Sequence, residues 1–513
     1  MDLVRSAGLL LHISSLPGNY GIGTLGQEAY DFADRLVAGG QQYWQILPFG
    51  PVSAIFEYSP YASRSAFAGN DLLISLNKLK EKWFALDIAP FTGKEADFIS
   101  FEKVVQHKRP ILEQGVEIFF ADDAGEEWKA YELFCKTAKH WLDDFALFAA
   151  LADHFKTDYW PSWDRAAAFR EPEALDRWRE RLNRKIDYYK VIQYIFYDQL
   201  ETLKQYCNRL GIKIIGDIPI YIPFESADVW AHPDIFQLDK KSGRPTAVSG
   251  VPPDYFSETG QRWGNPLYRW QDQSGTLNKV TMDWWCRRIQ HLNQYVDIIR
   301  IDHFRALESY WSIPAAEKTA VRGKWVAGPG IEFFRVLKKR LGVLPLIAED
   351  LGEITPDVEK LRDAVFLPGM KILQFAFDFN HQNPYLPHNY KNRNTIVYTG
   401  THDNNTTNGW FYGTEVDEDR RKYILDYMDS TNYSDFHWQL IKMAYASVAD
   451  LAIVPVQDIL GFGEPFRMNR PGTMGNNWKW KLKHAHLSDA LMMKLKHEVD
   501  LYGRSAVDPT QTG

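Results

Sequence analysis

Eight short apolar runs constrain the fold of this chain more than any other feature of its 513 residues. Strands of a parallel sheet are buried on both faces and therefore occur as short, continuous apolar segments. Helical stretches with clear end signals lie between most of the runs. Residues 332–341 stop at Gly342, and residues 356–363 open after Thr355 with proline at the first helical position. The runs cover residues 8–15, 42–49, 212–221, 296–304, 345–352, 370–377, 395–403 and 451–460.

Strand–helix alternation repeated in this way predicts an α/β fold, a (β/α)8 TIM barrel with helical insertions around its C-terminal mouth. The rival fold is a doubly wound open sheet, which usually carries a glycine-rich phosphate loop after its first strand. Gly21, Gly23 and Gly26 match the spacing of such a loop, but residues 16–18 separate them from the first run and no acidic residue ends the second run. We therefore interpret these glycines as turn residues.

The uneven spacing of the runs predicts two insertions into a single barrel domain that spans residues 1–513. Residues 60–185, between the second and third runs, are assigned to a largely helical insertion because much of their sequence is charged, aromatic and helical in character. Residues 223–281 are rich in Gly, Pro, Trp and Tyr with little periodicity, which is typical of a loop. Because this loop follows the third run, we expect it at the barrel mouth, where active sites lie. Residues 488–501 are expected to form an outer helix.

Composition and charge exclude several classes of partner. The net charge is -7 at pH 7 without a sustained basic run, so we expect no nucleic-acid partner. The apolar stretches are too short to cross a bilayer and the N-terminus lacks a cleavage signal, so we expect a cytoplasmic protein without membrane contact.

Cys135, Cys207 and Cys286 lack the spacing of a disulfide framework or a zinc site. Aromatic residues make up 14% of the chain and often lie near Gly, Pro and Asn, a placement that suits stacking on sugars.

Carboxylates stand where several runs end, which is where a barrel enzyme carries its catalytic residues. Asp217 belongs to the end of the third run, Asp302 to the fourth, Glu349 to the fifth and Asp403 to the seventh. Side chains alternate along a strand, so Arg300 and Asp302 point the same way, and the guanidinium is expected to hold the carboxylate ionised. The alternative interpretation of this pair is a barrel-lining ion pair without a role in catalysis.

Most enzymes that cleave a glycosidic bond use a pair of carboxyl groups. We therefore interpret Asp302 as the nucleophile and Glu349 as the general acid/base, held at the short separation that retaining chemistry requires. Asp403 is expected to stabilise the positive charge of the transition state, with His402 and Asn404 as ligands of sugar hydroxyls.

A divalent metal is the alternative use of these acids. His303 or His402 could join them as ligands, but Arg300 would repel a cation and the chain contains no H-E-x-x-H sequence, so we predict no metal site. Asp350 follows Glu349 directly, should point the opposite way, and is interpreted as a structural anchor.

Three segments at the ends of these runs resemble the 4-α-glucanotransferases, also called amylomaltases or disproportionating enzymes, of the α-amylase clan. They are residues 300–305 (RIDHFR), 348–352 (AEDLG) and 399–404 (TGTHDN), and the resemblance extends over essentially the whole chain. In that family the three segments carry the nucleophile, the acid/base and the stabiliser in this order. The resemblance therefore implies these roles for Asp302, Glu349 and Asp403. From their places at the same strand ends, we also expect substrate contacts of Asp217, Arg300, His303, His402 and Asn404.

Two further segments are similar to family loops that face each other over the active site. Residues 250–268 resemble the arching loop, for which the family implies glucan contacts of Tyr255, Trp263 and Asn265. The segment NRPGTMGNNW, which begins at Asn469, resembles the facing loop, and Asn469 is its expected substrate ligand. The alternative for both is a structural loop stiffened by proline.

Residues 59–70 resemble the family segment whose tyrosine, here Tyr61, stacks on the donor sugar. The chain departs from the family pattern just before this segment, because Glu57 and Tyr58 stand where Gly-Asp is common, and the upstream aromatic residue is Phe56. The departure concerns donor binding or a neighbouring glucan site.

The resemblance implies transfer of a segment of a 1,4-α-glucan to the 4-hydroxyl of glucose or of another 1,4-α-glucan, by retaining double displacement and without a cofactor. The partners are then maltooligosaccharides and glucans derived from starch or glycogen. One alternative is a hydrolytic α-amylase or α-glucosidase of the same clan, and another is a glucan-binding protein without turnover. The sequence does not specify an oligomeric state.

Overall fold

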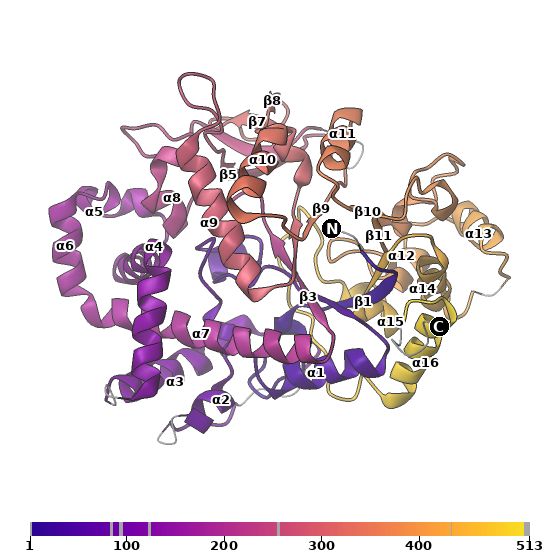
Figure 1. Cartoon of the computed structure of the whole chain (residues 1–513), viewed down its shortest axis with the longest axis horizontal. Helices are drawn as coiled ribbons and strands as arrows, with labels where there is room; N and C mark the ends of the chain where they lie inside the picture. The colour runs from indigo at the N-terminus through magenta and orange to yellow at the C-terminus, as the bar shows by residue number, and fades with distance from the viewer. Residues whose placement is uncertain are drawn as a thin grey trace.

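Eight strands form one parallel sheet at the centre of the molecule (Figure 1). The computed structural model describes residues 3–82, 86–91, 96–121, 125–253, 257–431 and 433–506. Neighbouring strands pair in the order β10-β11-β12-β1-β2-β3-β6-β9. The strands are β1 (Ser6–Leu10), β2 (Tyr43–Gln45), β3 (Lys213–Ile218), β6 (Ile298–Ile301), β9 (Leu346–Ala348), β10 (Gly369–Ile372), β11 (Thr395–Tyr398) and β12 (Leu451–Pro455).

The two ends of this sheet meet, so the strands form a closed barrel. β9 and β10 are in contact, and the N–H of Ala348 donates to the carbonyl of Pro368 at 3.0 Å across the seam. Each of the eight apolar runs contributes one strand, which confirms the predicted (β/α)8 barrel. The strands are shorter than the runs because the last residues of most runs leave the ladder and enter the loops at the mouth.

Alternate side chains of the strands fill the barrel interior. Ile215 of β3, Ile298 of β6 and Ile347 of β9 belong to one cluster of buried residues inside the barrel. Because strand side chains alternate, the residues two positions further along face the same way, at the mouth. These residues are Asp217, Arg300 and Glu349.

Helices cover the outside of the barrel. The predicted end of one helix and start of another are confirmed, since α10 ends before Gly342, which has a positive φ of 79°, and α11 begins at Pro356. Residues 373–394, between β10 and β11, differ from the expected pattern because they form only short 3-10 helices. The outer helices are α1 (Gln27–Ala38), α9 (Lys279–Tyr295), α10 (Gly330–Leu341), α11 (Pro356–Ala364), α12 (Thr407–Tyr412), α13 (Glu418–Tyr427), α14 (Phe436–Ala446), α15 (Val456–Ile459) and α16 (Asp489–Leu501).

Six α-helices lie between β2 and β3, at the left of Figure 1 and away from the C-terminal helices, in the described part of this segment. α4 packs along α7 and against α8, a short helix after β3. An apolar face drives this packing, because Leu142, Phe145 and Ala149 of α4 are buried. The six helices are α2 (Leu76–Lys82), α3 (Phe101–Ala121), α4 (Glu126–Phe155), α5 (Arg165–Ala168), α6 (Pro172–Arg181) and α7 (Asn183–Arg209). The helix after β3 is α8 (Ala227–Ala231).

A four-stranded antiparallel sheet corrects the expectation of an irregular loop over residues 223–281. Its order is β5-β4-β7-β8, and two of its strands come from this segment. These strands could not be recognised in the sequence, because they are short and partly exposed and therefore lack a continuous apolar run. The 3-10 helix Phe304–Leu307 connects β6 to this sheet. The strands are β4 (Ala247–Val251), β5 (Gln261–Pro266), β7 (Ser309–Pro314) and β8 (Lys324–Ala327).

The glycine triplet after β1 forms a turn, as predicted. Gly21 has a positive φ of 78°. The N–H of Gly23 donates to the carbonyl of Ser14 at 2.9 Å, and the N–H of Thr24 donates to the Glu28 carboxylate at 3.1 Å. These amides bind groups of the chain itself, so they do not form a phosphate cradle.

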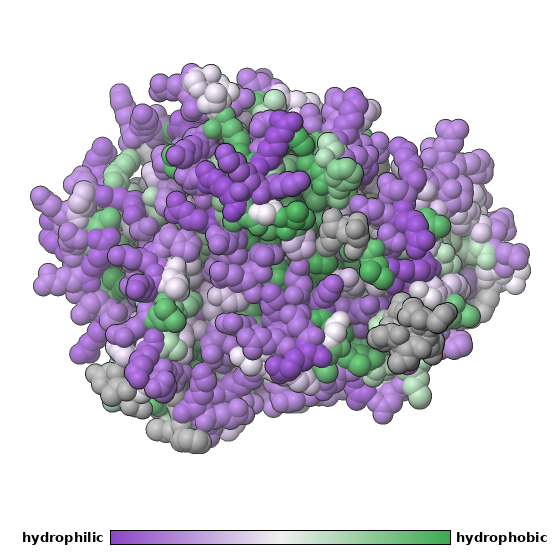
Figure 2. Space-filling model, in the orientation of Figure 1, coloured by the Kyte–Doolittle hydropathy of each residue, from purple (hydrophilic) through white to green (hydrophobic). Residues whose placement is uncertain are grey.

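The surface carries no extended apolar band on the face shown in Figure 2, where hydrophilic side chains surround separate hydrophobic groups. Within the described ranges, no helix is both long and apolar enough to cross a membrane.

Candidate active site

A buried arginine joins the carboxylates at the ends of β3 and β6. Arg300 Nη1 donates to Asp217 Oδ2 at 2.6 Å and to Asp302 Oδ1 at 3.1 Å. The Asp217 side chain is fully buried, whereas 27% of the Asp302 side chain is exposed. The pair expected from strand alternation is therefore formed, and Asp217 shares the guanidinium with it.

Glu349 is held against the peptide that carries Asp302. The N–H of His303 donates to Glu349 Oε2 at 2.6 Å, and the N–H of Leu351 donates to Oε1 at 3.0 Å. His303 directly follows Asp302 and has a positive φ of 51°. Such a conformation costs energy for a non-glycine residue and is often found at functional sites. The strained backbone of His303 therefore lies between the two acids, because it directly follows Asp302 and its N–H binds Glu349.

The acids of this cluster share one fixed positive charge. Burial raises the pKa of Glu349 to about 7, although Arg300 and the two backbone N–H groups act in the opposite direction. Burial also raises the pKa of Asp302 well above its usual value; Arg300 opposes this shift, and Asp217 adds to it. The carboxyl groups titrate together because each feels the charge of the others. The direct hydrogen bond from Arg300 favours the ionised form of Asp302, so a proton retained in the cluster is best held by Glu349.

Asp403 lies on the other side of the mouth and is fixed by the segment that follows β12. Asn469 Nδ2 donates to Asp403 Oδ1 at 2.6 Å, and His402 Nε2 lies 3.4 Å from the same oxygen. Burial lowers the pKa of His402, so its imidazole is neutral near pH 7. The Asp403 side chain is 47% exposed and can reach a ligand in the mouth.

Tyr61 connects the two sides of the site. Its hydroxyl donates to Asp217 Oδ2 at 2.6 Å, and its ring stacks on His402 with the centroids 5.0 Å apart. Trp478 lies beside the same tyrosine, with a centroid separation of 5.7 Å. Three of the predicted residues, Tyr61, Asp217 and His402, therefore form one continuous wall, which Asp403 extends through its contact with His402.

Trp263 projects from β5 toward the same mouth. Its ring meets the His303 ring edge-on at a centroid separation of 4.9 Å, and 38% of the residue is exposed. Asn265 is two positions further along β5, but Gly264 between them has a positive φ of 85° and the pairing with β4 is irregular here, so its contact with glucan stays a prediction. Tyr255, the third expected glucan contact of this segment, lies outside the described residues.

Asn404 and Asp350 shape the backbone next to the catalytic candidates. Asn404 Oδ1 accepts hydrogen bonds from the N–H and the hydroxyl of Thr401, each at 2.9 Å. Asp350 accepts the N–H of Met370 at 2.7 Å and pairs with Arg362, which confirms its predicted role as an anchor. The amide oxygen of Asn404 is thus engaged within its own loop, and its contact with sugar stays a prediction.

Two contributors to the site were not singled out in the sequence. Arg467 donates to the carbonyls of Asp403 and Asn469 at 2.6 and 2.7 Å, and Trp478 packs beside Tyr61. The only sequence signal was their proximity to the Asn-x-Pro-Gly turn, because arginine and tryptophan are common in loops and cores alike.

The departure from the family pattern has a structural counterpart. Glu57 and Tyr58 both have left-handed backbones, with φ of 52° and 59°. Glu57 Oε2 accepts the N–H of Gly475 at 2.8 Å, and Tyr58 stacks on Phe101 with the centroids 4.4 Å apart. The two residues therefore tie the segment before Tyr61 to the facing loop and to α3.

The described residues offer no group of three or more His, Cys, Asp or Glu side chains that could hold a metal ion. The acids at the mouth are instead balanced by Arg300.

Replacing Arg300 tests the electrostatic balance of the cluster. We expect Arg300→Met to destabilise the protein by about 3–5 kcal/mol at pH 7, because the fully buried Asp217 loses its partner. Urea unfolding monitored by tryptophan fluorescence measures the change. The double variant Arg300→Met/Asp217→Leu should recover part of this loss, since it removes the unpaired charge. A single variant as stable as the parent would contradict this role of Arg300.

Known proteins of similar sequence and structure identify the family. The family model for 4-alpha-glucanotransferase matches residues 11–487. The 4-alpha-glucanotransferase of Synechocystis sp. is 46% identical over 506 residues, which are 98% of this chain and 98% of that protein. The 4-alpha-glucanotransferase of Thermus thermophilus is 44% identical over 493 residues, covering 95% of this chain and 97% of its own length. The amylomaltase from Streptococcus agalactiae, solved in complex with acarbose, matches with a TM-score of 0.91 and 39% identity, over 98% of this chain and 100% of the other. The chain therefore belongs to the 4-α-glucanotransferase family.

Proposed function

We propose that this 4-α-glucanotransferase moves a segment of a 1,4-α-glucan to the 4-hydroxyl of glucose or of another 1,4-α-glucan by retaining double displacement. The observation that carries the proposal is the position of Glu349, whose carboxyl group binds the peptide N–H directly after Asp302 at 2.6 Å. This contact keeps Glu349 next to the backbone that carries Asp302, as retaining chemistry requires, whereas inverting enzymes leave room for a water molecule between their two carboxyl groups.

In the first step, Asp302 attacks the anomeric carbon of the donor and forms a covalent glycosyl ester. The bond from that carbon to the leaving oxygen breaks, and Glu349 gives its proton to this oxygen. The Arg300 hydrogen bond supports the ionised form of Asp302, and burial supports the protonated form of Glu349. The shortened glucan then leaves with a free 4-hydroxyl.

In the second step, the ionised Glu349 accepts the proton of the incoming 4-hydroxyl. The oxygen of the acceptor attacks the anomeric carbon and the bond to Asp302 breaks, which regenerates both carboxyl groups in their starting states. Two successive inversions preserve the α configuration. Water in place of the acceptor would give hydrolysis, which is the alternative function.

The remaining predicted residues bind and orient the sugar. Asp403, fixed by Asn469 and exposed to the mouth, is positioned to stabilise positive charge at the reacting carbon. Tyr61 and Trp263 offer ring faces for stacking. The other proposed substrate contacts are Asp217, Tyr255, Asn265, Arg300, His303, His402 and Asn404.

Two insertions are proposed to favour an acceptor sugar over water. Trp263 and Asn265 belong to the segment 223–281, and the helical segment 60–185 begins beside Tyr61. Side chains that cover the ester would restrict water and leave room for a flat sugar ring. Maltooligosaccharides and glucans from starch or glycogen are the proposed substrates.

Incubation with maltotriose tests the function. We expect glucose together with a ladder of longer oligosaccharides, because each transferred segment becomes part of a new chain. Chromatography of the products distinguishes this result from hydrolysis, which yields only shorter sugars. Asp302→Asn serves as the control and should lower the rate by roughly 10⁴-fold or more. Accumulation of short sugars alone would contradict transfer.

The pH dependence of donor cleavage follows from the pKa of Glu349. The general acid must be protonated in the free enzyme, and its pKa is raised to about 7, so activity should be lost as the pH rises through about 7. Initial rates at low maltotriose concentration give kcat/KM across pH 5–9, which reports the free enzyme. Full kcat/KM at pH 9 would contradict the role of Glu349 as acid.

A further inference from the structure

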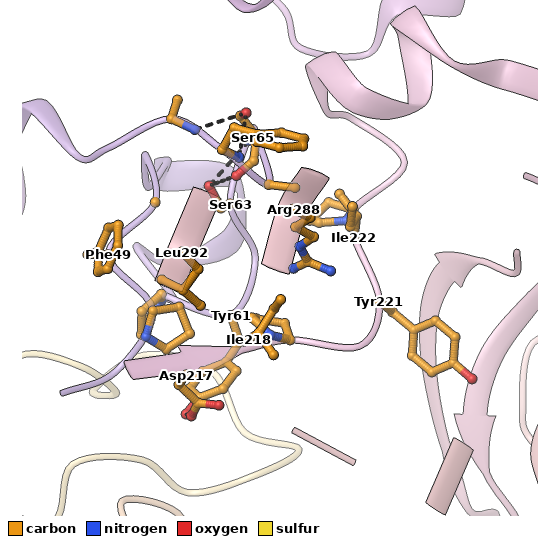
Figure 3. Close-up of a pocket in the computed structure, with 18 of the residues that line it drawn as sticks. Phe49, Tyr61, Ser63, Ser65, Asp217, Ile218, Tyr221, Ile222, Arg288 and Leu292 are labelled. Atoms are coloured by element: carbon orange, nitrogen blue, oxygen red, sulfur yellow. Dashed lines mark hydrogen bonds between the residues drawn. The ribbon is translucent and has the colours of Figure 1, made fainter. Parts of the chain in front are cut away.

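A small pocket lies beside Tyr61 and Asp217, which both contribute to its lining. It is bounded by the segment around Ser63 and Ser65, by the residues that follow β3, and by α9 (Figure 3). Its volume is about 50 Å³. The nominal need of one water molecule is roughly 10–15 Å³ of such volume, so the pocket accepts a few water-sized particles but no sugar ring.

Arg288 of α9 places a guanidinium in this pocket. The residue is only 4% exposed. Figure 3 shows its guanidinium lying among Leu292, Ile222 and Ile218. Within the described residues, Nε and Nη1 of Arg288 have no hydrogen-bond partner, and no carboxylate lies within 4.0 Å of the side chain. A charged group that makes neither kind of contact is rare in a protein interior.

Two aromatic rings border the guanidinium. The centroids of Trp284 and Trp285 lie 5.4 and 5.0 Å from its central carbon. The buried Asp228 carboxylate acts on the guanidinium electrostatically, but it forms no ion pair with Arg288 within 4.0 Å, and its Oδ2 accepts the N–H of Ala66 at 2.7 Å. The guanidinium therefore retains its charge at neutral pH and lacks a direct partner of opposite charge.

A second donor lines the same pocket. Ser65 is buried, and its hydroxyl oxygen accepts the N–H groups of Phe67 and Ala68 at 3.1 and 3.2 Å. An oxygen that already accepts two hydrogen bonds presents its own O–H as a donor. The polar groups at the pocket thus include a cation, a hydroxyl donor and the Asp217 carboxylate, which is already bound by Arg300 and by the Tyr61 hydroxyl. Much of the remaining lining is apolar.

We propose that this pocket binds one small monovalent inorganic anion of halide size next to Arg288. An unpaired buried charge costs several kcal/mol, and an anion removes this cost more completely than a neutral molecule. The pocket volume excludes sugars and larger oxyanion esters. The anion would also support the wall of the active site, because Tyr61 and Asp217 line the same pocket.

Crystals of the full chain grown in sodium bromide test the site directly. We expect an anomalous bromide peak inside the pocket, within hydrogen-bonding distance of the Arg288 guanidinium. Only water molecules at this position, with bromide bound elsewhere or absent, would overturn the proposal.

Solution measurements test the same site independently of crystals. The midpoint of thermal unfolding should rise by about 2 °C or more when gluconate is exchanged for bromide at constant ionic strength, because a ligand that binds only the folded state stabilises it. Arg288→Met should lose this difference, and Arg288→Lys should keep part of it. An equal response of the parent and Arg288→Met would overturn the proposal, and if Arg288→Met does not fold, the bromide peak of the parent decides.

Discussion

The guanidinium of Arg300 is the constraint on which the mouth of the barrel depends. It lies between the fully buried Asp217 and the partly exposed Asp302, and neither β3 nor β6 could end in a carboxylate at this depth without it. Strand alternation explains the position, since Arg300 stands directly above the apolar layer that contains Ile298. The same alternation brings Glu349 to the mouth from β9, beside the peptide of His303.

The rest of the site is assembled by long-range contacts around this centre. Tyr61 reaches Asp217 across 156 positions of the sequence, and Asn469 reaches Asp403 across 66. Tyr61 thereby joins its loop to a carboxylate on a barrel strand, whereas Asn469 fixes Asp403, which lies beyond the end of β11. The barrel strands therefore position Asp217, and contacts between loops complete the site.

Much of this arrangement was predictable from the sequence, because period and polarity mark barrel strands and their ends. The eight runs gave the barrel, and alternation gave the pairing of Arg300 with Asp302. The antiparallel sheet was missed because strands such as β5 are too exposed to show an apolar run. The contact of Arg467 with Asp403, and that of Glu57 with Gly475, could not be predicted, since they depend on how distant loops meet rather than on any local pattern.

The identity of the residue that becomes glycosylated tests the central claim most directly. A Glu349→Gln variant can cleave a maltotriosyl fluoride, because fluoride leaves without a proton, but it lacks the base for the second step. Mass spectrometry of its proteolytic peptides should therefore find the maltotriosyl group on Asp302. A label on Asp217 or Asp403, or rapid turnover without any trapped ester, would contradict the account.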